Sequence, residues 1–167
     1  MLPTAQFALP DEGATARLGA ALAAAIVAER AAIASRGLVV ALAGDLGAGK
    51  TALVRAMLRA LGVTGTVRSP TFTWVETYVV ADLDFHHFDF YRLADPEAFS
   101  FAGFREMFGP ARVCLIEWPD KAAGYLLPPD LRIELRLEGA GRRVTVTAKG
   151  ELGTACLQRV ATVMAAA

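Results

Sequence analysis

The stretch Ala41–Leu58, ALAGDLGAGKTALVRAML, changes its character twice within a few residues. It begins inside the apolar, β-branched run Leu38–Ala43, which is typical of a strand buried on both faces. From Lys50 onward the apolar residues recur at helical spacing, and Gly62 supplies a stop signal. The glycine-rich octet Gly44–Thr51 lies between the two patterns, so the sequence predicts a strand–loop–helix unit.

The octet has the form glycine, four residues, glycine, lysine, threonine, which is the pattern of a phosphate-binding loop. Its glycines allow consecutive amide N–H groups to point into one concavity, and the following helix adds the positive end of its dipole. Lys50 is expected on β- and γ-phosphate oxygens, and the Thr51 hydroxyl on Mg²⁺. We therefore predict that a nucleotide is bound by consecutive residues of this stretch: Leu46, Gly47, Ala48, Gly49, Lys50, Thr51 and Ala52.

Two acids are candidates for completing a magnesium site with Thr51. Glu117 closes the apolar strand pattern Arg112–Pro119, which is where such loops usually have their second acidic residue. Asp89 alternates with aromatic residues in a second strand pattern, and an acid there is costly to bury unpaired. We expect Asp89 to meet a cation, Mg²⁺ or water, and we favour the nucleotide site.

The aromatic and imidazole side chains near these acids are less decisive. Trp118 either belongs to the core or lies against the nucleotide, and the sequence favours neither. His86 and His87 are neighbours in a strand, so they face opposite sides and cannot form a two-histidine metal site. We expect one to be buried and the other exposed, and proton transfer by His87 remains an alternative.

The rest of the chain alternates predicted strands and helices. We predict strands at Thr4–Leu9, within Val67–Val80 and in the pattern FHHFDFYRL, helices at Asp11–Arg36, Asp95–Phe108 and Glu151–Ala166, and a hairpin around Gly139–Gly141. This order indicates one domain, residues 1–167, with an α/β, three-layer fold like that of phosphate-binding-loop NTPases. Its central sheet is expected to be mixed and mainly parallel, with a C-terminal β-hairpin.

Composition excludes several classes of protein. The chain has 167 residues with 17 basic and 17 acidic side chains, so no overall field attracts nucleic acid or an anionic membrane. The most membrane-like segment, Leu18–Ala28, is too short to cross a bilayer, and acids precede it, so we expect a cytoplasmic protein without a membrane partner. Cys114 and Cys156 are expected to be buried thiols, with a disulfide or a catalytic thiol as alternatives.

The residue types also limit the reaction. The chain contains no asparagine, so it lacks the Asn-Lys-x-Asp loop that commonly selects guanine, and its glutamines, Gln6 and Gln158, lie near the termini. Intrinsic hydrolysis should therefore be slow unless Glu117, Thr71 or a partner orients the attacking water. A small-molecule kinase is the alternative, although the arginines are scattered rather than gathered in a lid, and a regulatory switch without useful turnover is a further one.

Four motifs in this order and spacing, GDLGAGKT, SPTFT (69–73), HFDFYRL (87–93) and IEWP (116–119), resemble the TsaE (YjeE) family. These are bacterial ATPases of the pathway that adds the threonylcarbamoyl group to adenosine 37 of tRNA. The resemblance implies ATP and Mg²⁺ as cofactors, with Lys50, Asp89, Glu117 and Thr71 at the catalytic centre. It also implies association with the TsaB–TsaD heterodimer, which carries out the carbamoyl transfer. The neutral charge balance indicates that any contact with tRNA is local or is made indirectly through that complex.

The resemblance places further residues. It implies that SPTFT is a switch-like loop near the γ-phosphate, that Asp89 and Tyr91 organise the metal site, and that Trp118 lies near the nucleotide. Thr15, with the Asp11–Glu12 turn, is implied to lie near the adenine. The chain departs from the family at Ala52, where a hydroxyl residue is common and could supply one more phosphate contact.

Overall fold

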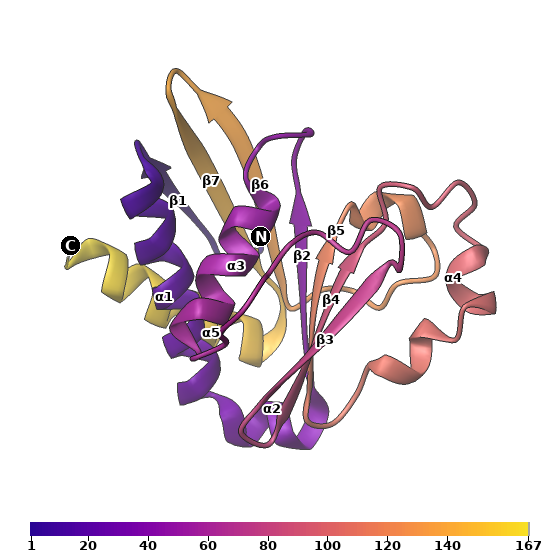
Figure 1. Ribbon diagram of the computed structural model, residues 1–167. Helices are drawn as coiled ribbons and strands as arrows, with labels where there is room; N and C mark the ends of the chain where they lie inside the picture. Colours follow the sequence, from indigo (N-terminus) through magenta and orange to yellow (C-terminus); the bar gives the residue numbers. More distant parts are fainter. Residues whose placement is uncertain (167) are drawn as a thin grey trace.

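The computed structural model describes residues 1–166 of the chain. The elements, in chain order, are β1 (Thr4–Leu9), α1 (Glu12–Ala28), α2 (Arg30–Arg36), β2 (Leu38–Ala43), α3 (Lys50–Ala60), β3 (Val75–Val80), β4 (Leu83–Asp89), α4 (Ala98–Phe101), the 3₁₀ helix η1 (Phe104–Met107), β5 (Arg112–Glu117), the 3₁₀ helix η2 (Pro119–Ala122), β6 (Leu131–Glu138), β7 (Gly141–Ala148) and α5 (Gly150–Ala165). Strands and helices alternate through most of the chain, as the sequence predicts (Figure 1).

All the strands join one 7-stranded sheet in the order β1-β7-β6-β2-β5-β4-β3. The central strands β6, β2, β5 and β4 are mutually parallel, whereas β1, β7 and β3 pair antiparallel at the two edges. The predicted α/β fold with a mixed, mainly parallel sheet and a C-terminal β-hairpin is therefore confirmed. Because parallel neighbours end at the same edge, the carboxyl ends of β2, β5 and β4 lie side by side.

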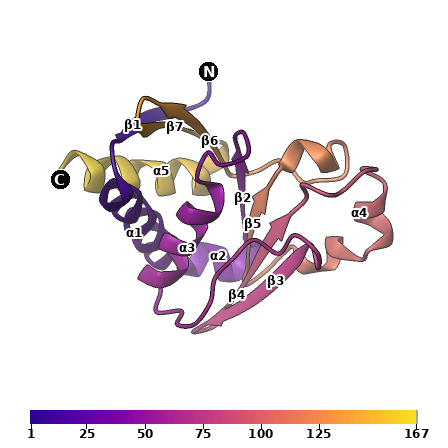
Figure 2. The same cartoon turned by 45° about the horizontal axis from the view of Figure 1, so that its top comes forward.

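The two faces of the sheet have different cores. On one face α1, α3 and α5 cover the large aliphatic core, to which β2 contributes Leu38, Val40 and Leu42. On the other face the short helices α4, η1 and η2 enclose a smaller, aromatic core around Phe88 and Phe90. Figure 2 shows α1, α3 and α5 gathered on one side and α4 beyond β4 and β5 on the other. The helical layer of α1, α3 and α5 is thus the thicker of the two. The loop that follows β2 leads into this layer through α3.

The predicted helix Asp11–Arg36 is wrong in one respect, because the chain breaks it at Glu29. Asp11 caps α1 as predicted, accepting a hydrogen bond from the amide of Ala14 at 2.8 Å. At Glu29 the helix axis bends by 70° into α2. A straight helix from Glu12 to Arg36 would be about 37 Å long, whereas β2, with its 6 residues, spans about 20 Å. The bend returns the chain to the start of β2, and the Glu29 carboxylate is held there by Arg159 of α5 at 2.7 Å.

The predicted helix Asp95–Phe108 is also wrong, because the range contains two short helices, α4 and η1, instead of one. Gly103 adopts φ +74°, which ends α4 and lets the separate helix η1 begin. The sequence pattern favoured one helix because the residue types on both sides of Gly103 suit one. The break allows Phe99, Phe104 and Phe108 to meet in the aromatic core, with Phe99 and Phe104 centroids 5.8 Å apart.

Both cysteines are free and buried, as the sequence predicts. Cys114 lies on β5 in the aromatic core and Cys156 on α5 in the aliphatic core. Burial raises the pKa of each thiol to about 12. Neither thiol is therefore an available nucleophile in the folded chain.

None of the helices in residues 1–166 is by itself long and apolar enough to cross a bilayer. Helices α1 and α2 reach that length and composition only when they are counted together, across the 70° bend.

Candidate functional site

The Gly44–Thr51 loop wraps the carboxyl end of β2 and leads directly into α3. Gly44, Gly47 and Gly49 have φ of +149°, +81° and +107°, so the tight turn uses backbone angles that other residues rarely adopt. Gly49 occupies the N-cap position of α3, and no side chain caps that helix. The amide groups of the first turn therefore face the loop's concavity, where the helix dipole favours negative charge.

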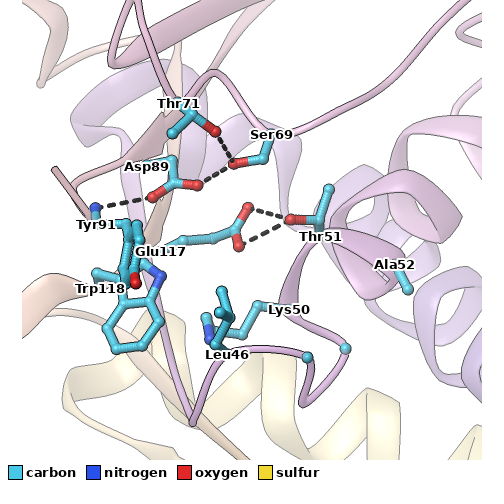
Figure 3. A pocket seen from close by; sticks show the side chains of 12 residues that line it. Leu46, Lys50, Thr51, Ala52, Ser69, Thr71, Asp89, Tyr91, Glu117 and Trp118 are labelled. Atoms are coloured by element: carbon cyan, nitrogen blue, oxygen red, sulfur yellow. Dashed lines mark hydrogen bonds between the residues drawn. The ribbon is translucent and has the colours of Figure 1, made fainter.

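A cavity of about 390 Å³ opens above this loop. It lies where β2, β5 and β4 end, and Figure 3 shows the side chains that converge on it. Its lining residues are Leu46, Gly47, Gly49, Lys50, Thr51, Ala52, Ser69, Thr71, Asp89, Tyr91, Glu117 and Trp118. The structure thus brings together almost all of the residues predicted for the site.

Two predicted residues do not line this cavity. Ala48 is buried in the loop, where its amide donates to the carbonyl of Asp45 and its own carbonyl accepts from Arg142. Thr15 is buried on α1, the helix that packs beside α3, and is not among the lining residues. The cavity therefore gives no support to a place for Thr15 beside the nucleotide, and its contact with the adenine stays a prediction.

Lys50 begins α3, and its side chain folds back over the loop. Its ammonium group donates to the carbonyl oxygens of Gly44 and Asp45 and lies 4.1 Å from the centre of the Trp118 ring. Burial lowers the pKa of Lys50 from its ordinary value, and the carboxylates of Glu117, Asp89 and Asp45 act in the opposite direction. The balance is typical of a cation held for an anionic ligand.

Thr51 and Glu117 contact each other across the cavity. The Thr51 hydroxyl lies 2.9 Å from both carboxylate oxygens of Glu117. Glu117 is last in β5, and its register partner on β2 is Leu42, close to the start of the loop. The residue is only 2% exposed, so the sequence-based alternative of a strand-end acid facing solvent is wrong.

Asp89 lies beside Glu117, because the two residues are register partners on β4 and β5. One Asp89 oxygen accepts a hydrogen bond from the Ser69 hydroxyl, and the other accepts from the amide of Tyr91 at 2.9 Å. Thr71 continues the chain of contacts, with its hydroxyl 3.5 Å from that of Ser69 (Figure 3). Asp89 therefore connects the SPTFT loop to the acidic end of the sheet.

The donor set fits a magnesium nucleotide. A hydroxyl and two carboxylates are hard oxygen ligands, and Mg²⁺ is usually held by one or two carboxylates together with phosphates and water. Within residues 1–166 no three histidine, cysteine or acidic side chains gather tightly enough to hold a metal alone. A divalent ion at Thr51, Glu117 and Asp89 would thus need phosphate oxygens to complete its coordination.

Trp118 and Tyr91 form one wall of the cavity. Their rings lie 5.0 Å apart, and Trp118 has φ +57°, which is uncommon for an aromatic residue. The left-handed backbone turns Trp118 out of β5 and over the ammonium of Lys50. The ring packs beside the aromatic core and also lines the cavity, so the core reading holds in part, and contact with a nucleotide stays a prediction.

Sequence reasoning missed two contacts of the site. The imidazole of His87 lies 2.6 Å from Glu117, and Arg142 of β7 lies 2.6 Å from the carbonyl of Ala48. His87 precedes Asp89 by two residues, so strand periodicity alone puts the two on one face. No comparable signal marks Arg142, because its contact depends on how the C-terminal hairpin folds over the loop. Both His86 and His87 are buried, so the expectation that one of them is exposed is wrong.

Comparison with known proteins agrees with these motifs. Residues 9–145 match the family model described as Threonylcarbamoyl adenosine biosynthesis protein TsaE. A Haemophilus influenzae protein named tRNA threonylcarbamoyladenosine biosynthesis protein TsaE is 40% identical over 145 residues, which are 87% of this chain and 90% of that protein. A Bacillus subtilis protein of the same name is 39% identical over 129 residues, 75% of this chain and 79% of the relative.

The fold has a solved counterpart. The crystal structure of YdiB from Bacillus subtilis superimposes with a TM-score of 0.77 and 28% sequence identity, covering 97% of each chain. The family model spans most of this chain, and relatives of that name match it over most of their own length. The chain therefore belongs to the TsaE family of tRNA threonylcarbamoyladenosine biosynthesis proteins.

Proposed function

We propose that the chain binds ATP with Mg²⁺ in the cavity above the Gly44–Thr51 loop and hydrolyses it slowly. The observation that carries this proposal is the convergence of the amide-lined loop, the Lys50 ammonium and the Thr51–Glu117 pair on one cavity. These groups suit a triphosphate and a divalent ion, and they come from two separate segments of the chain, the Gly44–Thr51 loop and the end of β5. The absence of an Asn-Lys-x-Asp loop favours adenine over guanine.

Each side chain has a distinct part in this proposal. The loop amides and the start of α3 bind the phosphates, and Lys50 exchanges its two carbonyl acceptors for phosphate oxygens. Thr51, Glu117 and Asp89 hold the metal, which when bound neutralises charge on the phosphate oxygens. Ser69 and Thr71, tied to Asp89, place the SPTFT loop where it can respond to the γ-phosphate.

The lining of the cavity supports the proposal that hydrolysis is slow. Neither a glutamine nor a histidine is among its lining residues, and both acids are engaged by donors from the protein. The attacking water therefore has no dedicated base, and Thr71, Glu117 or a partner must orient it. Single-turnover hydrolysis by the isolated chain at several per second would contradict this point.

The biological role we propose is a nucleotide-dependent switch on the TsaB–TsaD complex in the same cytoplasmic pathway. The family name supports a role in tRNA threonylcarbamoyladenosine biosynthesis. The chain carries no net charge, which favours contact with tRNA through the complex rather than directly. The small-molecule kinase gains no support, because no arginine lines the cavity.

The decisive experiment is ATP titration with and without Mg²⁺, followed by reconstitution of tRNA modification with TsaB and TsaD. Lys50→Ala and Glu117→Ala should fold, bind Mg·ATP far more weakly and fail to sustain repeated turnover. A flat titration of the wild-type chain at millimolar ATP would contradict the proposal. A phosphorylated metabolite, instead of free phosphate, would favour the kinase.

A further inference from the structure

His87 lies behind the cavity rather than in it. It sits on β4 two residues before Asp89, on the sheet face that α3 covers, and its side chain is fully buried. Its Nε2 atom lies 2.6 Å from Oε2 of Glu117. Its other nitrogen, Nδ1, is buried and has no hydrogen-bond partner among residues 1–166. The contact with Glu117 is thus the only polar contact that the ring makes within the described chain.

A purely structural role explains this arrangement poorly. The surrounding core is aliphatic, and a leucine or phenylalanine would fill the space without burying an unpaired nitrogen. An unpaired buried polar atom costs roughly 1–3 kcal/mol. Nε2 of His86 is also buried without a partner among residues 1–166, so the unpaired nitrogen alone does not single out His87. What distinguishes His87 is its contact with Glu117.

The effect of this contact is visible at the carboxylate of Glu117. The Thr51 hydroxyl lies 2.9 Å from both carboxylate oxygens, so this contact alone does not distinguish one oxygen from the other. His87 contacts Oε2 only, which fixes the rotation of the carboxyl group and assigns that oxygen to the protein. Oε1 is then the oxygen that remains for a metal. An N–H to carboxylate bond of this length is a strong, charge-assisted one.

We propose that His87 is a positioning residue that orients Glu117 and thereby sets the dependence of nucleotide binding on Mg²⁺. This inference rests on the proposed binding of Mg·ATP and adds a residue that does not touch the ligand. Partners that orient metal-binding side chains typically change metal affinity 10- to 100-fold when they are removed.

The test compares substitutions at the two neighbouring histidines. His87→Leu removes the donor, and His87→Gln keeps an N–H at a similar reach. His86→Leu is the matched control, since it makes the same change one residue earlier on the opposite face, where the ring contacts Thr77 at 2.9 Å. ATP binding is titrated at rising Mg²⁺ and in EDTA, and circular dichroism checks folding. Should His87→Leu not fold, His87→Phe keeps a planar ring without the donor.

We expect His87→Leu to need about tenfold or more Mg²⁺ for half-maximal ATP binding, with binding in EDTA unchanged. His87→Gln should need nearly as little Mg²⁺ for half-maximal ATP binding as the wild type, and His86→Leu should need the same amount as the wild type. Wild-type Mg²⁺ dependence in a folded His87→Leu or His87→Phe chain would overturn the role of His87 alone. A wild-type chain without Mg²⁺-dependent ATP binding would instead overturn the proposed function.

A double variant separates an effect through Glu117 from a general effect on the site. If His87 acts through Glu117, His87→Leu in a Glu117→Gln background should not further raise the Mg²⁺ concentration needed for half-maximal ATP binding. Losses that add in the double variant would show that His87 supports the site by another route, and the inference would be overturned.

Discussion

Lys50 has an ammonium group at a buried position, where burial disfavours the charged form. Burial lowers its pKa, because the folded chain destabilises the ammonium form. The unfolded chain thus binds more protons at pH values between the lowered pKa and the ordinary one, 10.5. The free energy of unfolding should rise with pH across that range, as far as Lys50 contributes. We therefore expect the charge of Lys50 to serve a ligand rather than stability.

The corresponding prediction concerns Lys50→Met. This variant replaces the buried ammonium by an apolar side chain of similar length, so the free chain should unfold at a temperature no lower than that of the wild type. Mg·ATP should raise the unfolding temperature of the wild type, because a ligand that binds only the folded state stabilises it, and should leave the variant unchanged. Thermal unfolding with and without Mg·ATP measures both effects. A variant that is clearly less stable without nucleotide would show that the ammonium supports the fold.

At the scale of elements, the position of the loop depends on how α3 packs against α1. Gly19 of α1 faces α3, and a Cβ atom there would lie 2.4 Å from that of Ala56. Glycine is a poor helix former, so its presence in the middle of α1 is explained by this close approach. The backbone of α3 thus lies nearer to α1 than any larger residue at position 19 would permit.

We therefore expect Gly19→Ala to destabilise the chain, although it favours the helix itself. The intrinsic gain is about 1 kcal/mol, whereas overpacking typically costs about 1–3 kcal/mol, and α3 must shift in response. Ala20→Gly, on the exposed side of the same helix, is the control, and it should lose about 1 kcal/mol through helix propensity alone. Urea unfolding measures both variants, and ATP affinity should fall only for Gly19→Ala. A Gly19→Ala chain more stable than the wild type would contradict the packing argument.

Elements were predictable where the local pattern and the tertiary structure agree. The strand Leu38–Ala43 and the start of α3 follow from composition and glycine placement alone. The break at Glu29 has neither glycine nor proline to mark it, and it is set by the path that the chain must take to β2. Gly103 did carry a signal, but an isolated glycine is compatible with a continuing helix. Local pattern thus fixed the types of element and left the bends to packing.

At the scale of the whole molecule, the sequence predicted which residues belong to the site but not the hydrogen bonds among them. Glu117 was predicted as the acid that closes an apolar strand, and Asp89 as an acid that is costly to bury unpaired. The structure adds that the two lie at the ends of neighbouring parallel strands. Which donors each carboxylate receives depends on register and on the loop between α3 and β3. The contacts of Ser69 and His87 with these acids therefore became visible only in three dimensions.

The C-terminal hairpin of β6 and β7 lies beside β2 in the sheet and contacts the Gly44–Thr51 loop. Arg142, at the start of β7, donates from Nε to the carbonyl of Ala48 at 2.6 Å. A Cβ atom on Gly49 would lie 2.6 Å from the same nitrogen. Glycine at position 49 therefore leaves room for the side chain of Arg142. The side chain of the adjacent Arg143 forms an ion pair with Glu138 on the exposed side of the hairpin. Two neighbouring arginines thus differ in whether they touch the loop.

We expect Arg142→Ala to weaken Mg·ATP binding by roughly five- to tenfold, because one hydrogen bond that holds the loop is worth about 1 kcal/mol or slightly more. Arg143→Ala removes an exposed ion pair, which is worth about 0–1 kcal/mol, and should leave ATP affinity unchanged. Amide hydrogen exchange without nucleotide separates holding the loop from contacting ATP. Faster exchange within Gly44–Thr51 in Arg142→Ala, but not in Arg143→Ala, would show that the hairpin shapes the loop before any ligand arrives. Unchanged exchange together with weaker binding would instead place Arg142 in contact with the nucleotide.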